Sequence, residues 1–132
     1  MKNIKFLLVM LSLMTGSLLA QEPTVTNLMV KDLVGFSGKE VLMMVVEYPP
    51  GGADPVHRHN APGFIYVLEG TVVMQVKGGT EVTLKPGQTF YESSDDIHVV
   101  GRNGSTTKSA KFLVFLVKDK KAPAFVPVNP SP

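Results

Sequence analysis

The feature that most constrains the fold is the regular interruption of short apolar runs by glycine and proline. Turn-forming groups such as Pro49-Pro50-Gly51-Gly52, Lys77-Gly78-Gly79 and Lys85-Pro86-Gly87 recur along the chain, at roughly six- to twelve-residue spacing. The runs between them are rich in β-branched and aromatic residues, which favour strands. No run has helix caps or an amphipathic stripe. These patterns predict an all-β chain of about eight or nine short antiparallel strands, closed into a barrel or jelly roll.

The clearest predicted strand is Lys39–Tyr48, whose Val and Met content indicates burial on both faces. Glu69-Gly70 is predicted to form a tight hairpin between strands at Phe64–Leu68 and Thr71–Val76. The run Lys111–Val117 is expected to close the core. Other strands are expected at Leu28–Val34, Thr80–Leu84, Thr89–Tyr91 and Ile97–Val100.

The first twenty residues have the pattern of a secretory signal. Lys2 and Lys5 precede an apolar run, Phe6–Met14, and small residues lead to a predicted cut after Ala20. The apolar run is shorter than the 17 to 25 residues or so that a membrane span needs. We therefore expect export to the periplasm or the medium, with no membrane attachment after cleavage. The predicted organisation is a signal at 1–20, an arm and first strand at 21–38, a barrel at 39–117 and a proline-rich extended tail at 118–132.

Charge and cysteine content limit the possible partners. The 132-residue chain has 13 Lys+Arg and 11 Asp+Glu, so removing Lys2 and Lys5 with the signal leaves 13 − 2 = 11 positive against 11 negative residues. A neutral mature protein gives no indication of nucleic-acid binding. The chain has no cysteine, so disulfides and thiolate ligands are excluded and any metal must be bound through nitrogen and oxygen.

The chain has three histidines, and two of them are separated by a single residue. If Val56–His59 is extended, His57 and His59 lie on the same face of the strand, where two imidazoles can bind one metal ion. The alternative is a solvated polar end of a loop. The third histidine, His98, falls in another predicted strand.

Beyond these patterns, the first histidine segment resembles the first motif of the cupin superfamily, G-x5-H-x-H-x3,4-E-x6-G. Gly51, His57, His59 and Gly70 occupy the matching positions. The glutamate position of the motif is occupied by Gly63. Loss of this carboxylate would leave a metal site one negative charge poorer, which would raise the Lewis acidity of the ion and weaken its retention.

The second motif of the same family, G-x5-P-x-G-x2-H-x3-N, is similar to the segment that begins at Gly87 and includes His98. Ser93 and Asp95 replace its proline and glycine. Arg102 stands at the asparagine position, and Asn103 follows it. The resemblance covers about Lys39 to Val117.

A resemblance to small single-domain, conserved-barrel (type 2) cupins implies a jelly roll with His57, His59 and His98 meeting at its inner mouth. It further implies one divalent transition metal ion, which could be Fe, Mn, Cu, Zn or Ni. The implied activity is that of a mononuclear three-histidine metalloenzyme of dioxygenase (quercetinase-like) type with a small organic substrate. The alternatives are a non-catalytic periplasmic protein that binds a metal or small ligand, and histidines that pack in a barrel without metal. Such cupins commonly form homodimers.

The residue that could supply a fourth ligand is left open. Gln88, Tyr91 and Glu92 lie near the second motif, and Gln75 lies on the strand after the first.

The parity of the strand that begins at Gly63 predicts an apolar inner wall. Ile65 and Val67 would point inward, while Phe64 and Tyr66 would point outward. Arg58 is expected on the outer surface.

Overall fold

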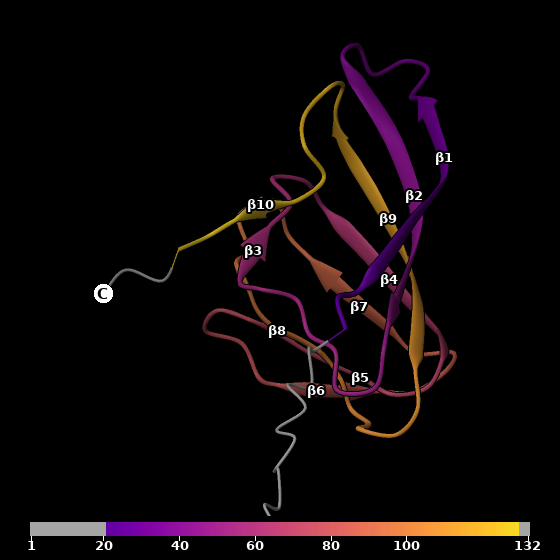
Figure 1. The fold of residues 1–132 in the computed structure, drawn as a ribbon. Helices are drawn as coiled ribbons and strands as arrows, with labels where there is room; N and C mark the ends of the chain where they lie inside the picture. Colours follow the sequence, from indigo (N-terminus) through magenta and orange to yellow (C-terminus); the bar gives the residue numbers. More distant parts are fainter. Residues whose placement is uncertain (1–20, 130–132) are drawn as a thin grey trace, which may run out of the picture.

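The structure is a computed structural model that describes residues 21–129, and the predicted signal Met1–Ala20 lies outside the described residues. The described chain contains ten strands and no helix (Figure 1). The strands are β1 (Thr24–Asp32), β2 (Lys39–Tyr48), β3 (His57–Arg58), β4 (Gly63–Glu69), β5 (Val72–Val76), β6 (Val82–Leu84), β7 (Thr89–Glu92), β8 (His98–Asn103), β9 (Ala110–Asp119) and β10 (Val126–Pro127).

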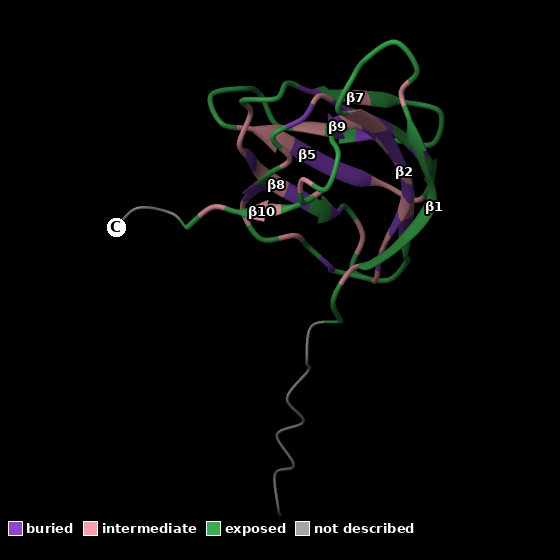
Figure 2. Cartoon of the chain, turned by 90° about the horizontal axis from the view of Figure 1, so that it is seen from above, coloured by how far each residue is buried: buried purple, intermediate pink, exposed green. Residues whose placement is uncertain are grey.

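The strands form two antiparallel sheets, ordered β1-β2-β9-β4-β7 and β10-β3-β8-β5-β6. Seen from above, the sheets enclose a common interior, and the buried residues lie on their inner faces (Figure 2). The all-β jelly roll expected from the sequence is therefore confirmed.

The central pair of the first sheet is β2 with β9, paired in register from Lys39↔Asp119 to Tyr48↔Ala110. The bounds predicted for β2 are confirmed, and the predicted burial of both its faces holds only in part, because on the second face Val41 alone is buried. Its buried positions alternate from Leu42 through Met44 and Val46 to Tyr48, and the positions between them are half-buried. The reason is that no further layer of the described chain covers the outer face of this sheet.

The predicted hairpin at Glu69-Gly70 is wrong. β4 pairs with β7 and β9 in one sheet, whereas β5 pairs with β6 and β8 in the other. Gly70 instead carries the chain from one sheet to the other, with a φ of 75°. A Cβ at this position would lie 2.5 Å from the carbonyl oxygen of Ser109, so both the conformation and the close approach require glycine.

The two ends of the described chain both join the sheets. β1 begins at Thr24, before the predicted Leu28, and pairs with β2 along its length. In the C-terminal tail, β10 pairs with β3 so that Pro127 lies opposite His57. The described part of the tail therefore lies against the same end of the barrel as the histidine pair.

The core lies between the sheets. Its fully buried side chains include Val67, Met74 and Leu116, each 0 % exposed. Burial of such a side chain contributes about 1.5 to 3 kcal/mol. Residues 21–129 contain no helix of the length and apolarity needed to span a membrane.

Candidate metal centre

Two neighbouring strands bring the histidines together. His57 in β3 lies directly opposite His98 in β8, and His59 is the residue immediately after β3. One ring nitrogen from each of the three histidines lies within 4.8 Å of the others. The ring of His57 is 4.9 Å, centre to centre, from each of the other two rings. The structure thus brings together all three histidines named from the sequence.

Burial separates this cluster from a solvated loop end. His57 is 2 % and His98 is 5 % exposed, and His59 is half-buried. The interpretation of His57 and His59 as a solvated polar loop end is therefore wrong. Buried imidazoles need partners for their ring nitrogens, so the partners indicate what the cluster can bind.

Backbone carbonyls fix the orientation of the first two rings. Nδ1 of His57 donates to the carbonyl oxygen of Pro55 at 2.8 Å, and Nδ1 of His59 donates to the carbonyl oxygen of Ala124. This arrangement leaves Nε2 of each ring as the nitrogen that can bind a metal. Burial lowers the pKa of His57 to about 4, a fall that its bond to Pro55 only partly offsets. His57 is therefore neutral near pH 7, as a metal ligand must be.

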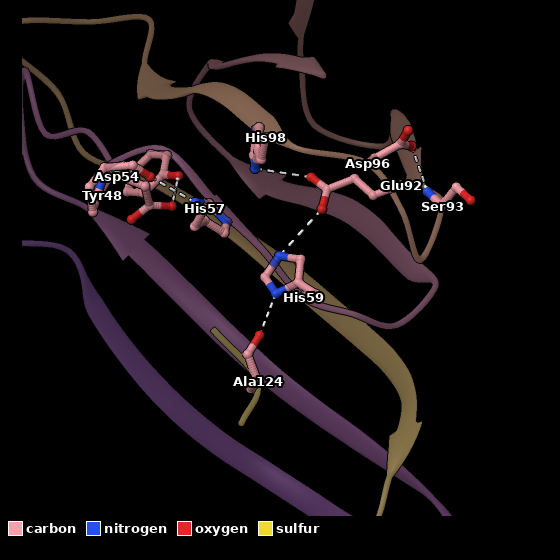
Figure 3. Close-up of polar contacts among 10 residues, drawn as sticks. Tyr48, Asp54, His57, His59, Glu92, Ser93, Asp96, His98 and Ala124 are labelled. Carbon is pink, nitrogen blue, oxygen red and sulfur yellow. Dashed lines mark hydrogen bonds and ion pairs between the residues drawn. The ribbon is translucent and has the colours of Figure 1, made fainter. Parts of the chain in front are cut away.

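A buried carboxylate completes the cluster. Glu92, the last residue of β7, is 3 % exposed. Its Oε1 lies 3.0 Å from Nδ1 of His98 and its Oε2 lies 3.3 Å from Nε2 of His59. Figure 3 shows the Glu92 carboxylate between these two rings.

Glu92 and His59 shift each other's pKa as the partners of an ion pair do. Burial raises the pKa of Glu92, but the hydrogen bond from His59 and the charges of the histidines outweigh it, and the pKa falls below its usual value. Burial lowers the pKa of His59, but its bonds to Glu92 and Ala124 outweigh that effect, and the pKa rises. Both pKa shifts favour the charged forms, a protonated His59 beside an ionised Glu92.

His98 provides the test of whether a metal fits. Both of its ring nitrogens are buried without a hydrogen bond, although Oε1 of Glu92 lies 3.0 Å from Nδ1. A buried polar atom without a partner is rare and calls for a bound group. Imidazole nitrogen and carboxylate oxygen are ligands that first-row divalent ions accept. The residues present therefore fit such an ion.

The structure separates the candidates for a fourth ligand. Glu92 is the only one of them that faces the histidines among the described residues. Tyr91 is 55 % exposed, and the side chains of Gln75 and Gln88 bond to backbone groups in their own exposed turns. Glu92 lies directly opposite Gly63 in the β4–β7 pairing, and Gly63 is the position at which the first cupin motif has its glutamate. Sequence spacing does not reveal such a pairing.

The cluster lies in a cavity of about 400 Å³. Most of its lining is apolar and includes Leu42, Met44, Val46, Ile65, Met74, Phe112 and Val114. The inward direction predicted for Ile65 and Val67 is confirmed, since they are 4 % and 0 % exposed. The predicted outward direction of Phe64 and Tyr66 is confirmed too, at 47 % and 45 %. Arg58 is exposed, as expected.

A second polar pair, which the sequence did not reveal, also lines the cavity. The Tyr48 hydroxyl donates to Oδ2 of Asp54 at 2.5 Å. Burial raises the pKa of Asp54 above its usual value, and the bond from Tyr48 only partly offsets this effect. Burial also raises the pKa of Tyr48, and the charge of Asp54 adds to that shift. The pair can therefore hold a proton beside the histidines.

The family is established by comparison. The Cupin domain family model matches residues 44–116, which is more than half of the chain and includes the three histidines and Glu92. The chain belongs to the cupin superfamily. No curated protein matches it significantly.

Solved structures with the same fold include several enzymes. The chain is 25 % identical to the polyketide cyclase RemF from Streptomyces resistomycificus, with a TM-score of 0.63 and coverage of 85 % of this chain and 75 % of that one. For the DMSP lyase DddQ from Ruegeria pomeroyi the identity is 23 %, the TM-score 0.68 and the coverage 89 % and 57 %. For an oxalate oxidase in complex with glycolate the identity is 22 %, the TM-score is 0.60, and the coverage is 79 % of this chain and 54 % of that one. The chain thus spans little more than half the length of the last two.

Proposed function

We propose that this protein is an exported metal-binding cupin, a mononuclear three-histidine metalloenzyme of dioxygenase (quercetinase-like) type that acts on a small organic substrate. The observation that carries the proposal is the buried triad of His57, His59 and His98 in an apolar cavity, with neither ring nitrogen of His98 in a hydrogen bond. A site of this kind exposes a reactive position to a molecule small enough to enter.

The chemistry is divided between the ion and the chain. When bound, a divalent ion supplies Lewis acidity and open coordination positions. The apolar walls exclude water and favour an aromatic or aliphatic body. Asp54, whose pKa is raised, can accept a proton from a substrate hydroxyl while the Tyr48 hydroxyl holds it in place. These groups suit a substrate with an acidic hydroxyl on an apolar frame.

The similar structures support small-molecule chemistry without naming the reaction. A polyketide cyclase, a DMSP lyase and an oxalate oxidase share the fold, but a fold hosts many reactions. We further propose a homodimer. Phe64, Tyr66, Leu68 and Tyr91 are exposed on two neighbouring strands, β4 and β7, and water-exposed apolar patches favour association.

One observation favours the alternative of a non-catalytic metal- or ligand-binding protein. The tail lies over the cluster: the ring of Phe125 stacks on His57, with centres 4.3 Å apart, and Ala124 bonds to His59. A covered site would retain a ligand and limit exchange of substrate and product.

Oxygen consumption separates these two functions. The mature protein, loaded in turn with Fe²⁺, Mn²⁺, Cu²⁺, Zn²⁺ or Ni²⁺, is assayed with a panel of catechols and flavonols in an oxygen electrode. The proposal expects uptake with at least one pair of metal and substrate, abolished in His98→Ala and kept in the surface variant Arg58→Ala. Absence of uptake from every metal-loaded sample would refute the dioxygenase and leave the binding protein.

A further inference from the structure

Gly63 is not explained by its own backbone. Among the described glycines, those with positive φ are Gly35, Gly38, Gly51, Gly70, Gly78 and Gly87. Gly63 is the first residue of β4 and does not have a positive φ. Glycine in a strand often marks a place where another group approaches closely.

Two side chains approach Gly63, those of Leu116 and Glu92. Gly63 and Glu92 are directly paired across β4 and β7. A Cβ at Gly63 would lie 3.7 Å from Oε2 of Glu92 and 3.2 Å from Cδ2 of Leu116. The carboxylate of Glu92 thus lies in the space that a longer side chain at position 63 would enter.

We propose that Glu92 is the carboxylate ligand of the metal centre and that it supplies, from β7, the charge that the first cupin motif places at the position of Gly63. The glutamate is thus on the strand paired with β4 instead of on β4 itself. This inference rests on the metal site proposed above. It replaces the expectation of a site that is poorer by one negative charge.

The partners of Glu92 favour this role. Its oxygens contact only His59 and His98, and no Lys or Arg of residues 21–129 forms an ion pair with it. Every other ion pair of the described chain joins a Lys or Arg to an Asp or Glu. A carboxylate that is 3 % exposed needs a positive charge nearby, which a proton on His59 or, with neutral histidines, a bound metal ion can supply.

The distances also fit a shared ion. With metal–ligand bonds of about 2.1 Å and tetrahedral or octahedral angles, neighbouring ligand atoms lie roughly 3.0 to 3.4 Å apart. The oxygens of Glu92 lie 3.0 Å and 3.3 Å from nitrogens of His98 and His59. These distances allow one ion to contact this carboxylate together with the rings of His59 and His98.

The test uses Co²⁺ as a probe on the mature protein, with affinity from chelator competition and ligand geometry from the visible absorption spectrum. Glu92→Gln keeps the shape of the side chain and removes its charge. We expect it to weaken Co²⁺ binding at least tenfold and to change the spectrum, whereas the surface variant Glu81→Gln, which loses only an exposed pair with Arg102, should match wild type. Circular dichroism of each metal-free variant verifies folding.

A strand exchange provides the decisive comparison. Glu92→Gly should lose affinity as Glu92→Gln does, and the double variant Gly63→Glu/Glu92→Gly should regain affinity and a carboxylate-type spectrum. Wild-type affinity and spectrum in Glu92→Gln would overturn this inference alone, provided that His98→Ala loses Co²⁺. Absence of Co²⁺ binding by the wild type would overturn the metal site as well.

Discussion

Metal-free protein should lose stability in mild acid because of His57. This residue is 2 % exposed, and burial lowers its pKa from 6.5 to about 4. A group whose pKa is depressed by folding contributes stability above its unfolded pKa, and that stability is lost as the pH falls towards the folded value. The relevant window is therefore between pH 6.5 and 4.

The size of the effect follows from the shift. At pH 5 the unfolded chain binds a proton at His57 and the folded chain does not. Because pH 5 is about 1.5 units below the pKa of the unfolded chain, the free energy of unfolding falls by about 2 kcal/mol. His59 acts in the opposite direction. Because folding raises its pKa, its contribution is fully present below 6.5 and is lost at higher pH.

Urea unfolding in a chelator at pH 7.5 and pH 5, for wild type and His57→Gln, isolates the effect of His57. The variant retains His59, so the difference between the two proteins in their pH-dependent loss of stability reports His57. We expect wild type to lose about 2 kcal/mol more than the variant. Equal losses in both proteins would show that the pKa of His57 is not lowered by folding.

Three further substitutions test the packing around the site. Asn103→Ala should lower the free energy of unfolding by about 1 to 3 kcal/mol in urea titrations, because the buried Asn103 amide donates to three backbone carbonyls; an unchanged midpoint would contradict this. Met74→Ala, at a position with no exposure, should cost about 2 to 5 kcal/mol by thermal unfolding, and a cost below 1 kcal/mol or so would mean that the core collapses around it. Phe125→Ala removes the ring stacked on His57 and should speed Zn²⁺ uptake in stopped-flow measurements, whereas an unchanged rate would mean that the tail does not restrict access.

The sequence predicted the strands well where local alternation and turn residues decide them. β2 has the predicted bounds because Pro49 and Pro50 end its ladder. The prediction failed where the structure depends on pairing between strands that are distant in the sequence. Glu69-Gly70 has the local signature of a hairpin, yet Gly70 crosses between sheets because it packs against Ser109.

The candidate site shows the same division. The spacing of the histidines could be matched to a family motif, but the choice among fourth ligands required the pairing of Gly63 with Glu92. The asparagine position is a further example. Arg102 stands at the position of the motif, but it is exposed and pairs with Glu81, while the buried amide comes from Asn103. A shift of one residue along a strand reverses the face of the side chain, and sequence spacing does not fix that face.

The central claim is that His57, His59 and His98 hold one metal ion in the mature protein. The most direct measurement is elemental analysis of protein purified from its export compartment without added metal, beside His57→Ala and His98→Ala. We expect close to one transition metal ion per wild-type chain and a loss of that ion from both variants. The same metal content in all three proteins, or a wild type that stays metal-free after incubation with Zn²⁺, would contradict the claim.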